Sequence, residues 1–168
     1  MNCLKLKLIF SGLLFASGLA SAELLIGTVT SVHDGDTITL HTRTEIRKIR
    51  LAGIDAPELK QSYGPESRVA LKQDILNQTV TVDTRKQDKY GRSVGKVLLN
   101  GEDVNLKQVS RGLAWLYVKY LPELTAEDRL SYKNAQESAQ QVQLGLWGQN
   151  APEEPWSFRK KPVERAMK

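Results

Sequence analysis

Cysteine and histidine are scarce in this sequence. The only cysteine is Cys3, close to the N-terminus, and the only histidines are His33 and His41. The chain beyond Cys3 can therefore form no internal disulfide, no thiolate zinc site and no cysteine nucleophile. Mechanisms that need a pair of histidines or a histidine-held metal lack their residues as well. His33 stands beside a predicted turn, and we interpret it as a partly exposed structural residue.

Long hydrophobic runs are missing too, apart from one apolar stretch near the N-terminus. This stretch follows Lys5 and Lys7, is interrupted by serine and glycine, and falls short of the roughly 20 residues that a membrane span needs. Residues 20–22, Ala-Ser-Ala, are typical of a signal-peptidase cleavage site. We therefore expect residues 1–22 to be a signal peptide, and the rest to be exported, secreted or periplasmic, without a membrane anchor. An uncleaved anchor is the alternative.

A strong charge of either sign is also absent. Removing Lys5 and Lys7 from the 24 basic residues leaves 22 against 19 acidic residues, a net charge of +3. This mild excess permits a polyanionic partner, but many solvated surfaces have the same balance. A length of 168 residues, with 40% apolar and 26% charged residues, is typical of one compact globular domain. A monomer is the default expectation.

Short β-rich runs alternate with turn residues in two parts of the chain. Between residues 25 and 54, the runs "LLIGTVTSVH", "DTITLHT" and "IRKIRLAGI" are separated by Asp34-Gly35 and by a polar turn at residues 43–45. This pattern predicts three consecutive antiparallel strands. Two more runs, at residues 79–85 and 93–100, predict strands joined through residues 88–91.

Helices are predicted from their start and stop signals. A first helix begins at Pro65 and Glu66, with proline in an early position, and extends to Gln78. A short second helix covers about residues 103–111. The third helix, at residues 125–144, starts with a capping box. One face of this helix carries Tyr132, Ala135, Ala139 and Val142.

This order of elements predicts an α+β fold that is mainly β. We expect a five-stranded barrel of the oligonucleotide-binding type (OB-fold) with three packed helices, formed by residues 23–148. Residues 149–168 are rich in proline and charge. They are expected to form a basic, extended or disordered tail, attached to the domain through Trp156.

Three carboxylates stand at the predicted strand ends. Asp36 begins the second strand, and Asp55 and Glu58 flank Pro57 at the end of the third. Adjacent strands can bring Asp36 and Asp55 together. Unpaired carboxylates would repel there, so we expect a hard divalent cation between them, Ca²⁺ or Mg²⁺. For the Asp34-Gly35-Asp36 turn alone, the alternative is an ordinary hairpin turn with solvated side chains.

Two arginines accompany the carboxylates. Arg50 lies within the third predicted strand, and Arg92 follows the turn "DKYG" at the start of the fifth. Taken singly, either arginine is compatible with an ordinary surface ion pair. A guanidinium group is also the side chain that best matches the geometry of a phosphate, and two of them can hold the charge of a pentacoordinate phosphorus.

Four motifs in this order, "DGDT", "IRLAGIDAPE", "DKYGR" and "RGLAW", resemble the staphylococcal nuclease (thermonuclease) family. The resemblance runs from about Leu25 to Trp147, nearly all of the chain after the leader. It implies an OB-fold barrel with three helices. It also implies a Ca²⁺-dependent endonuclease that hydrolyses phosphodiester bonds of DNA and RNA and leaves 3′-phosphates.

The resemblance implies a role for each charged residue of these motifs. Asp36 and Asp55 match the direct calcium ligands, and Ala56 would add its backbone carbonyl. Glu58 matches the general base or water-positioning carboxylate. The arginines that would bind the phosphate and stabilise the transition state are Arg50 and Arg92.

Substrate contacts are implied for a second group of residues. Lys89 and Tyr90 match the pair that contacts a nucleotide's terminal phosphate, and Tyr120 matches one of two nucleotide-facing tyrosines. Val118 stands where the family has the other tyrosine, so Tyr117 either substitutes for it or belongs to the core. Stacking of bases on aromatic rings tolerates sequence changes, so losing one ring weakens binding rather than changing the substrate class.

The sequence departs from the family's type member near the expected metal site. Ala56 replaces a threonine, which keeps the carbonyl ligand but removes a hydroxyl group. The loop between Glu58 and Pro65 is shorter, so the lysine contacts of that loop have no counterpart here.

A second function remains open from the sequence. An exported OB-fold module could bind nucleic acid without cutting it, although a pure binding module would not need the complete set of carboxylates and arginines. A third possibility is a domain whose charged turns have no function.

Overall fold

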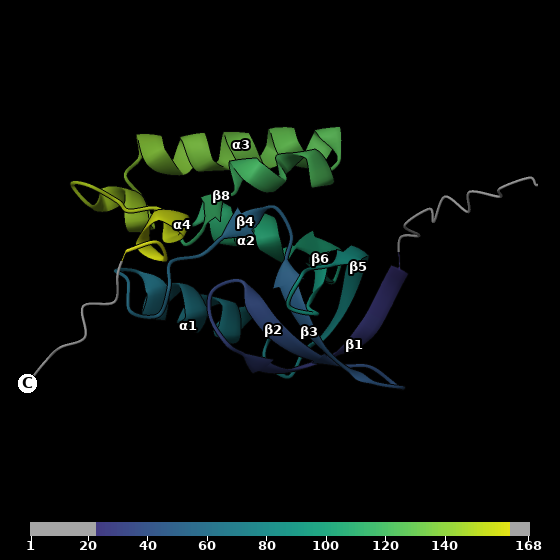
Figure 1. Ribbon diagram of the computed structural model, residues 1–168. Coiled ribbons are helices and arrows are strands. Elements are labelled where there is room, and N and C mark those ends of the chain that lie inside the picture. Colours follow the sequence, from purple (N-terminus) through teal and green to yellow (C-terminus); the bar gives the residue numbers. More distant parts are fainter. Residues whose placement is uncertain (1–22, 162–168) are drawn as a thin grey trace, which may run out of the picture.

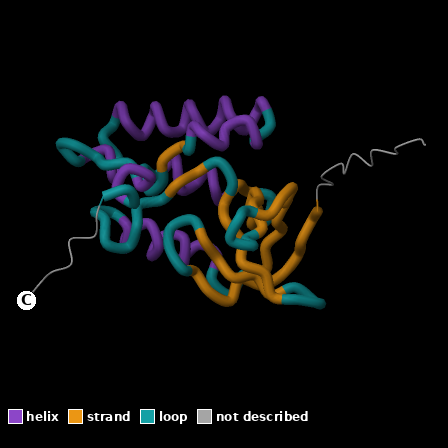
Figure 2. The backbone as a smooth tube through the Cα atoms, viewed as in Figure 1, coloured by secondary structure: helices purple, strands orange, loops and turns teal. Residues whose placement is uncertain are grey.

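A computed structural model describes residues 23–161 of the protein (Figure 1). The predicted signal peptide, residues 1–22, lies outside the described residues, as do residues 162–168. Figure 2 shows the long strands gathered in one part of the molecule and the helices along its other sides.

Five strands close into a barrel. They pair in the order β3-β2-β1-β5-β6, and β6 pairs in parallel with β3 to complete the ring. The OB-type barrel predicted from the sequence is therefore confirmed, and closure leaves few free strand edges. The five strands are β1 (Glu23–Val32), β2 (Thr37–His41), β3 (Ile46–Leu51), β5 (Thr79–Gln87) and β6 (Ser93–Leu99).

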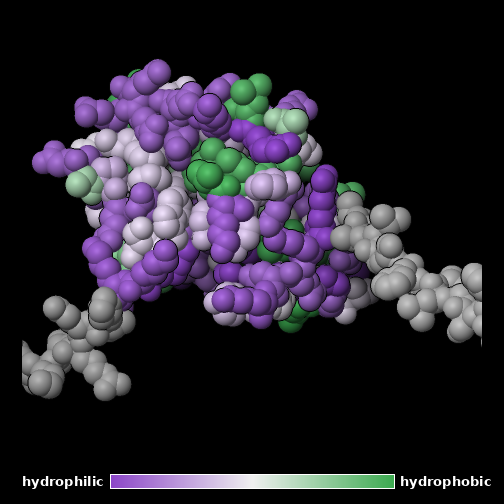
Figure 3. Space-filling model, turned by 45° about the horizontal axis from the view of Figure 1, so that its top comes forward, coloured by the Kyte–Doolittle hydropathy of each residue, from purple (hydrophilic) through white to green (hydrophobic). Residues whose placement is uncertain are grey.

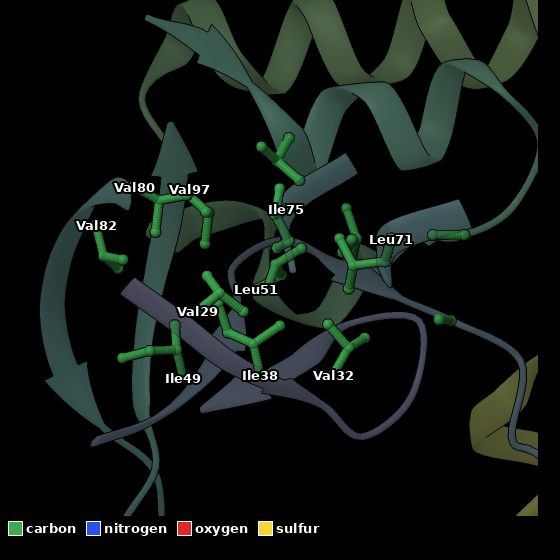
Figure 4. Packing of buried hydrophobic residues seen from close by; sticks show 14 of the residues in the cluster. Val29, Val32, Ile38, Ile49, Leu51, Leu71, Ile75, Val80, Val82 and Val97 are labelled. Atoms are coloured by element: carbon green, nitrogen blue, oxygen red, sulfur yellow. The ribbon is translucent and has the colours of Figure 1, made fainter. Parts of the chain in front are cut away.

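Apolar side chains of alternating strand positions fill the barrel (Figure 4). Each strand contributes residues with almost no exposed surface, as expected when successive side chains point to opposite faces. Leu71 and Ile75, from the first helix, join the same cluster. The buried strand residues labelled in Figure 4 are Val29, Val32, Ile38, Ile49, Leu51, Val80, Val82 and Val97.

The three predicted helices are present. They are α1 (Gly64–Ile75), α2 (Val104–Ser110) and α3 (Ala126–Gln141). The Asp103 side chain caps α2 by accepting from the amide of Leu106 at 3.0 Å, and a short strand, β7 (Glu102–Asp103), precedes this helix. The Thr125 hydroxyl caps α3 by accepting from the amide of Asp128 at 3.0 Å.

The apolar face predicted for α3 is correct except at its end. Tyr132 and Ala139 are buried and Ala135 packs against the core. The helix ends at Gln141, earlier than predicted, so Val142 lies beyond it and is exposed.

A second, smaller sheet lies between the barrel and α3. Strand β4 (Ile54–Asp55) pairs with β8 (Trp115–Leu116), so Asp55 lies opposite Trp115. The 3₁₀ helix η1 (Val118–Glu123) follows β8, and η2 (Gly145–Gly148) follows α3. This sheet holds Asp55 in place from a part of the chain far away in sequence.

The chain after Trp147 corrects the expectation of an extended or disordered tail, as far as the structure describes it. Residues Pro155–Phe158 form a short helix, α4. In Figure 1 this yellow helix lies beside β4 and β8. Trp156 stacks on Tyr117 with the rings 5.0 Å apart, so the attachment expected at Trp156 is present. The aromatic contacts outweigh the polar composition of the segment.

The described surface is largely hydrophilic on the face shown in Figure 3, with an apolar patch near its middle. Among residues 23–161, helices long and apolar enough to span a bilayer are absent.

Candidate active site

The first component of the site is a tight turn before β2. Asp34 accepts a hydrogen bond from the amide of Asp36 at 3.0 Å, which closes the turn. A Cβ atom on Gly35 would lie 1.9 Å from Ser67 Oγ and 2.6 Å from the Ala56 side chain, so only glycine fits. Gln108 of α2 donates to the Gly35 carbonyl at 2.9 Å. The turn that presents Asp36 is thus fixed by α1, α2 and the loop after β4.

Gln108 and Ser67 were not predicted from the sequence as parts of the site. Gln108 is fully buried, and its side-chain nitrogen also donates to the Ser67 carbonyl at 3.1 Å. A glutamine inside an apparently ordinary helix gave no signal of this role, because the contact joins positions far apart in the chain.

Two buried carboxylates meet one guanidinium group at the centre of the site. Arg50 Nη2 lies 2.8 Å from Asp55 Oδ1 and 3.2 Å from Asp36 Oδ2. Asp36 is 5% exposed and Asp55 is 1% exposed. The strand register brings Asp36 to Arg50, because Thr37 lies opposite Arg50 across β2 and β3 and Asp36 directly precedes Thr37. Asp55 comes from β4. The sequence prediction that these residues gather is confirmed.

Burial governs the protonation of this pair. It raises the pKa of Asp36 to about 6, against the opposing effect of the Arg50 charge. Burial also raises the pKa of Asp55, although hydrogen bonds from Arg159 and the charge of Arg50 oppose the shift. Both carboxylates are therefore poorly solvated anions that gain from a bound cation.

Ala56 and Glu58 follow on the loop after β4. The Ala56 amide donates to Asp36 Oδ2 at 2.7 Å, which ties the two predicted metal-binding segments together. The Glu58 amide donates to the Gln61 side chain at 3.1 Å. Glu58 itself is partly exposed, with 37% of its side chain accessible. Within the described residues, no three Asp, Glu, His or Cys side chains form a ready cage for a metal ion, so a cation here needs backbone or water oxygens as well.

Arg92 belongs to the hairpin between β5 and β6. Its guanidinium forms a forked contact with Asp88, in which Nε and Nη2 each lie 2.7 Å from Oδ2. The Asp88 side chain also accepts from the amides of Tyr90 and Arg92 at 2.9 and 3.0 Å. Although partial burial opposes it, these hydrogen bonds lower the pKa of Asp88. Asp88 thus shapes the hairpin and restrains Arg92, whereas Arg92 makes no ion pair with Asp36 or Asp55.

The four predicted substrate-binding residues lie around the same opening. The ammonium group of Lys89 lies 5.0 Å from the ring of Tyr90. Tyr117 contacts Tyr120 edge to face at 4.7 Å. Tyr117 is also stacked on Trp156, so its ring is covered by this tryptophan rather than open to a base.

All ten residues predicted for the site line one groove of about 610 Å³. The structure therefore brings together every residue singled out from the sequence, from segments spread over the chain. They are Asp36, Arg50, Asp55, Ala56, Glu58, Lys89, Tyr90, Arg92, Tyr117 and Tyr120.

One further residue of the groove was missed in the sequence. Arg159, just after α4, donates to Glu58 at 2.7 Å and to the two Asp55 oxygens at 3.2 and 2.8 Å. Arg159 belongs to no recognisable motif or hydrophobic period. It lies 104 positions from Asp55, so nothing in the sequence signals that the two residues meet. Trp156 was the only local signal that this segment returns to the domain.

Comparisons with known proteins agree with this geometry. The sequence profile described as "Staphylococcal nuclease homologue" matches residues 48–149, which is more than half of the chain. The chain belongs to the staphylococcal nuclease family. The matched range includes Arg50, Asp55, Glu58 and Arg92, while Asp36 precedes it.

Several relatives of the family are similar over most of their length. An uncharacterized endonuclease of Escherichia coli O157:H7 is 39% identical over 139 residues, covering 79% of this chain and 84% of the relative. One from Haemophilus influenzae is 36% identical, covering 79% and 71%. A protein of Shigella flexneri named micrococcal nuclease is 33% identical, covering 80% of each. A staphylococcal nuclease fold and nuclease activity follow from these findings, and nucleic acid is the implied substrate.

Proposed function

We propose that this protein is a Ca²⁺-dependent endonuclease that cuts phosphodiester bonds in DNA and RNA by in-line attack of water, leaving 3′-phosphates. One observation carries the proposal. Two buried carboxylates, Asp36 and Asp55, converge on Arg50 in a groove that also contains Glu58 and Arg92. The groove therefore contains carboxylates for a cation, a further carboxylate for a water molecule and arginines for a phosphate.

The residues present fit a calcium ion. Guanidinium groups already lie against the carboxylates, Arg50 on Asp36 and Asp55 and Arg159 on Asp55 and Glu58. The donor atoms are therefore oxygens that attract a cation, and hard oxygen donors are what Ca²⁺ prefers. Asp36, Asp55 and the Ala56 carbonyl would hold it. When bound, Ca²⁺ supplies Lewis-acid neutralisation of a phosphate oxygen and a template for water.

Glu58 is the proposed water-positioning residue. It stands three residues after Asp55, on the loop that follows β4, and its backbone amide is held by Gln61 beside the groove. A carboxylate there can accept a proton from water as the water attacks phosphorus. Its greater exposure than Asp55 suits a group that must exchange protons with solvent.

Arg50 and Arg92 are the proposed phosphate-binding arginines. Arg50 approaches the groove from β3 and Arg92 from the β5–β6 hairpin, so two guanidinium groups can contact different oxygens of one phosphate. The transition state carries more negative charge than the ground state. Donors fixed before the reaction therefore bind it more strongly, which accelerates the reaction.

The cellular setting belongs to the same proposal. We propose that the enzyme acts as a monomer after export, in the periplasm or outside the cell. Phosphate contacts read no base information, so both DNA and RNA are expected substrates.

One assay tests the proposal. Residues 23–168 are incubated with heat-denatured DNA or matched RNA, in calcium or in excess chelator, beside an Asp55→Asn variant. We expect calcium-dependent degradation of both substrates by the wild type and little by the variant. Equal degradation in chelator would contradict the calcium requirement.

A non-catalytic nucleic-acid-binding module is the second candidate. The observation in its favour is that Arg159 pairs with Asp55 and Glu58, the carboxylates that the nuclease needs. The same assay separates the two functions, because a binding module shifts the mobility of the DNA in a gel without shortening it.

A further inference from the structure

The end of the described chain returns to the active site. We call residues 153–161, which include α4, the strap. Its two ends are joined by an ion pair between Lys161 and Glu153 at 2.6 Å. The Glu153 carbonyl accepts from Gln61, the same residue whose side chain accepts from the Glu58 amide. The strap is thus linked to the loop that carries Glu58.

Aromatic packing anchors the strap. The Trp156 and Tyr117 rings are nearly parallel, 2° apart in orientation and 5.0 Å between centroids. Trp156 also meets Trp115 edge to face at 5.8 Å, and Pro155 is buried. Such ring pairs contribute about 0.5–1.5 kcal/mol each beyond the area they bury. These contacts hold the strap across a tyrosine that otherwise faces the groove.

Beyond this anchor, Arg159 occupies the carboxylates. Its Nη1 lies 2.7 Å from Glu58 and 3.2 Å from Asp55, and its Nη2 lies 2.8 Å from Asp55. Both terminal nitrogens are therefore engaged by acceptors that a cation and an attacking water would use. The hydrogen bonds to Asp55 and Glu58 outweigh partial burial and raise the pKa of Arg159, so its charge is permanent.

We propose that the strap is an autoinhibitory element, in which Arg159 competes with the divalent cation for Asp55 and with the attacking water for Glu58, while Trp156 covers Tyr117. The competition for the cation rests on the function proposed above. One positive group must leave before another takes the same oxygens. Cation binding and strap release are therefore coupled, and each must favour the other to the same extent.

The contacts of the strap are weak enough for it to be released. Arg159 keeps 41% of its side chain exposed, so its ion pairs are weaker than fully buried ones. The helix α4 has only four residues, and a segment this short opens at low cost. The aromatic contacts and ion pairs of the strap therefore favour the form in which Arg159 occupies the carboxylates, without making that form permanent.

The first measurement is calcium affinity by titration calorimetry, on residues 23–168. Arg159→Gln removes the competing charge, and Lys160→Gln is the matched control, because Lys160 is exposed and its side chain makes no ion pair within residues 23–161. We expect Arg159→Gln to bind calcium roughly fivefold more tightly or better, within the usual range of coupling between sites. Lys160→Gln should match the wild type. Asp55→Asn should lose binding in either background.

The second measurement is hydrogen exchange in the strap. Calcium should accelerate exchange of backbone amides in residues 153–161 of the wild type and should leave the Asp55→Asn variant unchanged. This readout does not depend on nuclease activity. It reports whether the strap leaves when the cation arrives.

The outcomes separate this inference from the proposed function. Calcium binding of equal strength in wild type and Arg159→Gln, with unchanged exchange in the strap, would overturn the inference and leave the nuclease proposal intact. Unchanged calcium affinity with reduced cleavage by Arg159→Gln would also overturn it, since Arg159 would then serve the substrate. Absence of calcium binding in both proteins would overturn the proposed function itself.

Discussion

The two sides of the groove are built differently. The carboxylate side consists of Asp36 in the turn before β2, Arg50 on β3 and Asp55 on β4, and its two carboxylates are almost completely buried. The hairpin side, Lys89, Tyr90 and Arg92, lies between β5 and β6, where Tyr90 is 71% exposed. A chemical step needs groups fixed before the substrate arrives, whereas contacts to a variable polymer benefit from adaptable side chains. We therefore propose that the carboxylate side determines turnover and the hairpin side mainly determines binding, with Arg92 between them.

Arg50→Lys should have the largest effect on the carboxylate side. Lysine keeps the charge, but its single ammonium group cannot contact Asp36, Asp55 and a phosphate with the planar fork of arginine. We expect kcat to fall on the order of 10²- to 10³-fold. Single-turnover cleavage of a labelled oligonucleotide measures it, with circular dichroism as the check on folding. A folded variant within tenfold of the wild type would show that the carboxylate side is less critical than its burial suggests.

Arg92→Ala tests the residue that joins the two sides. It removes a proposed transition-state donor from an exposed hairpin, so the rate should fall on the order of 10²-fold, with little change in the free energy of unfolding. Arg85→Ala, on the exposed part of β5, is the control. A comparable loss in both variants would indicate a general charge effect rather than a specific donor.

Asp36→Asn should stabilise the calcium-free protein at neutral pH. Burial raises the pKa of Asp36 from 3.8 to about 6, so the native state binds more protons than the unfolded state between these values. In the wild type, protonated Asp36 contributes to the free energy of unfolding below pH 4, and this contribution is lost as the pH rises through 6. At about 1.4 kcal/mol per pKa unit, the shift from 3.8 to about 6 corresponds to a gain of about 3 kcal/mol for the variant at pH 7. Urea unfolding in chelator at pH 4 and pH 7 measures this, and an equal difference at both values would contradict it.

Tyr90→Ala should have the smallest effect. Loss of one exposed aromatic contact costs about 1 kcal/mol, so KM should rise roughly fivefold while kcat stays unchanged. Steady-state kinetics on single-stranded DNA give both constants, with Tyr90→Phe as the conservative control. A fall in kcat instead would place Tyr90 on the chemical side of the comparison.

Much of the barrel was predictable because its signals are local. The alternation in β2 and β3, the cap at Thr125 and the proline at the start of α1 each determine their own element. The meeting of Asp36 and Arg50 followed from the pairing of neighbouring strands. Asp55 reaches them from β4, which pairs with β8 rather than with β2. Short motifs then indicated the function of these positions.

The contacts that were not predictable join distant parts of the chain through single side chains. Gln108 supports the turn at Gly35, and Arg159 reaches Asp55, without any periodic pattern to announce either contact. The composition of the tail indicated disorder, but Trp156 and Pro155 provide enough packing to order a short helix. Composition describes the average of a segment, whereas one buried ring can determine where it lies.

The most direct test of the proposed chemistry is the cleavage rate of Glu58→Gln at saturating calcium. The substitution keeps the shape of the side chain but removes the group that would accept a proton from water, and it also weakens the hold of Arg159. Glu137→Gln on α3, exposed and away from the groove, is the control. We predict a folded protein whose rate is reduced on the order of 10²-fold or more. A rate near that of the wild type would contradict the assignment of Glu58 and, with it, the proposed mechanism.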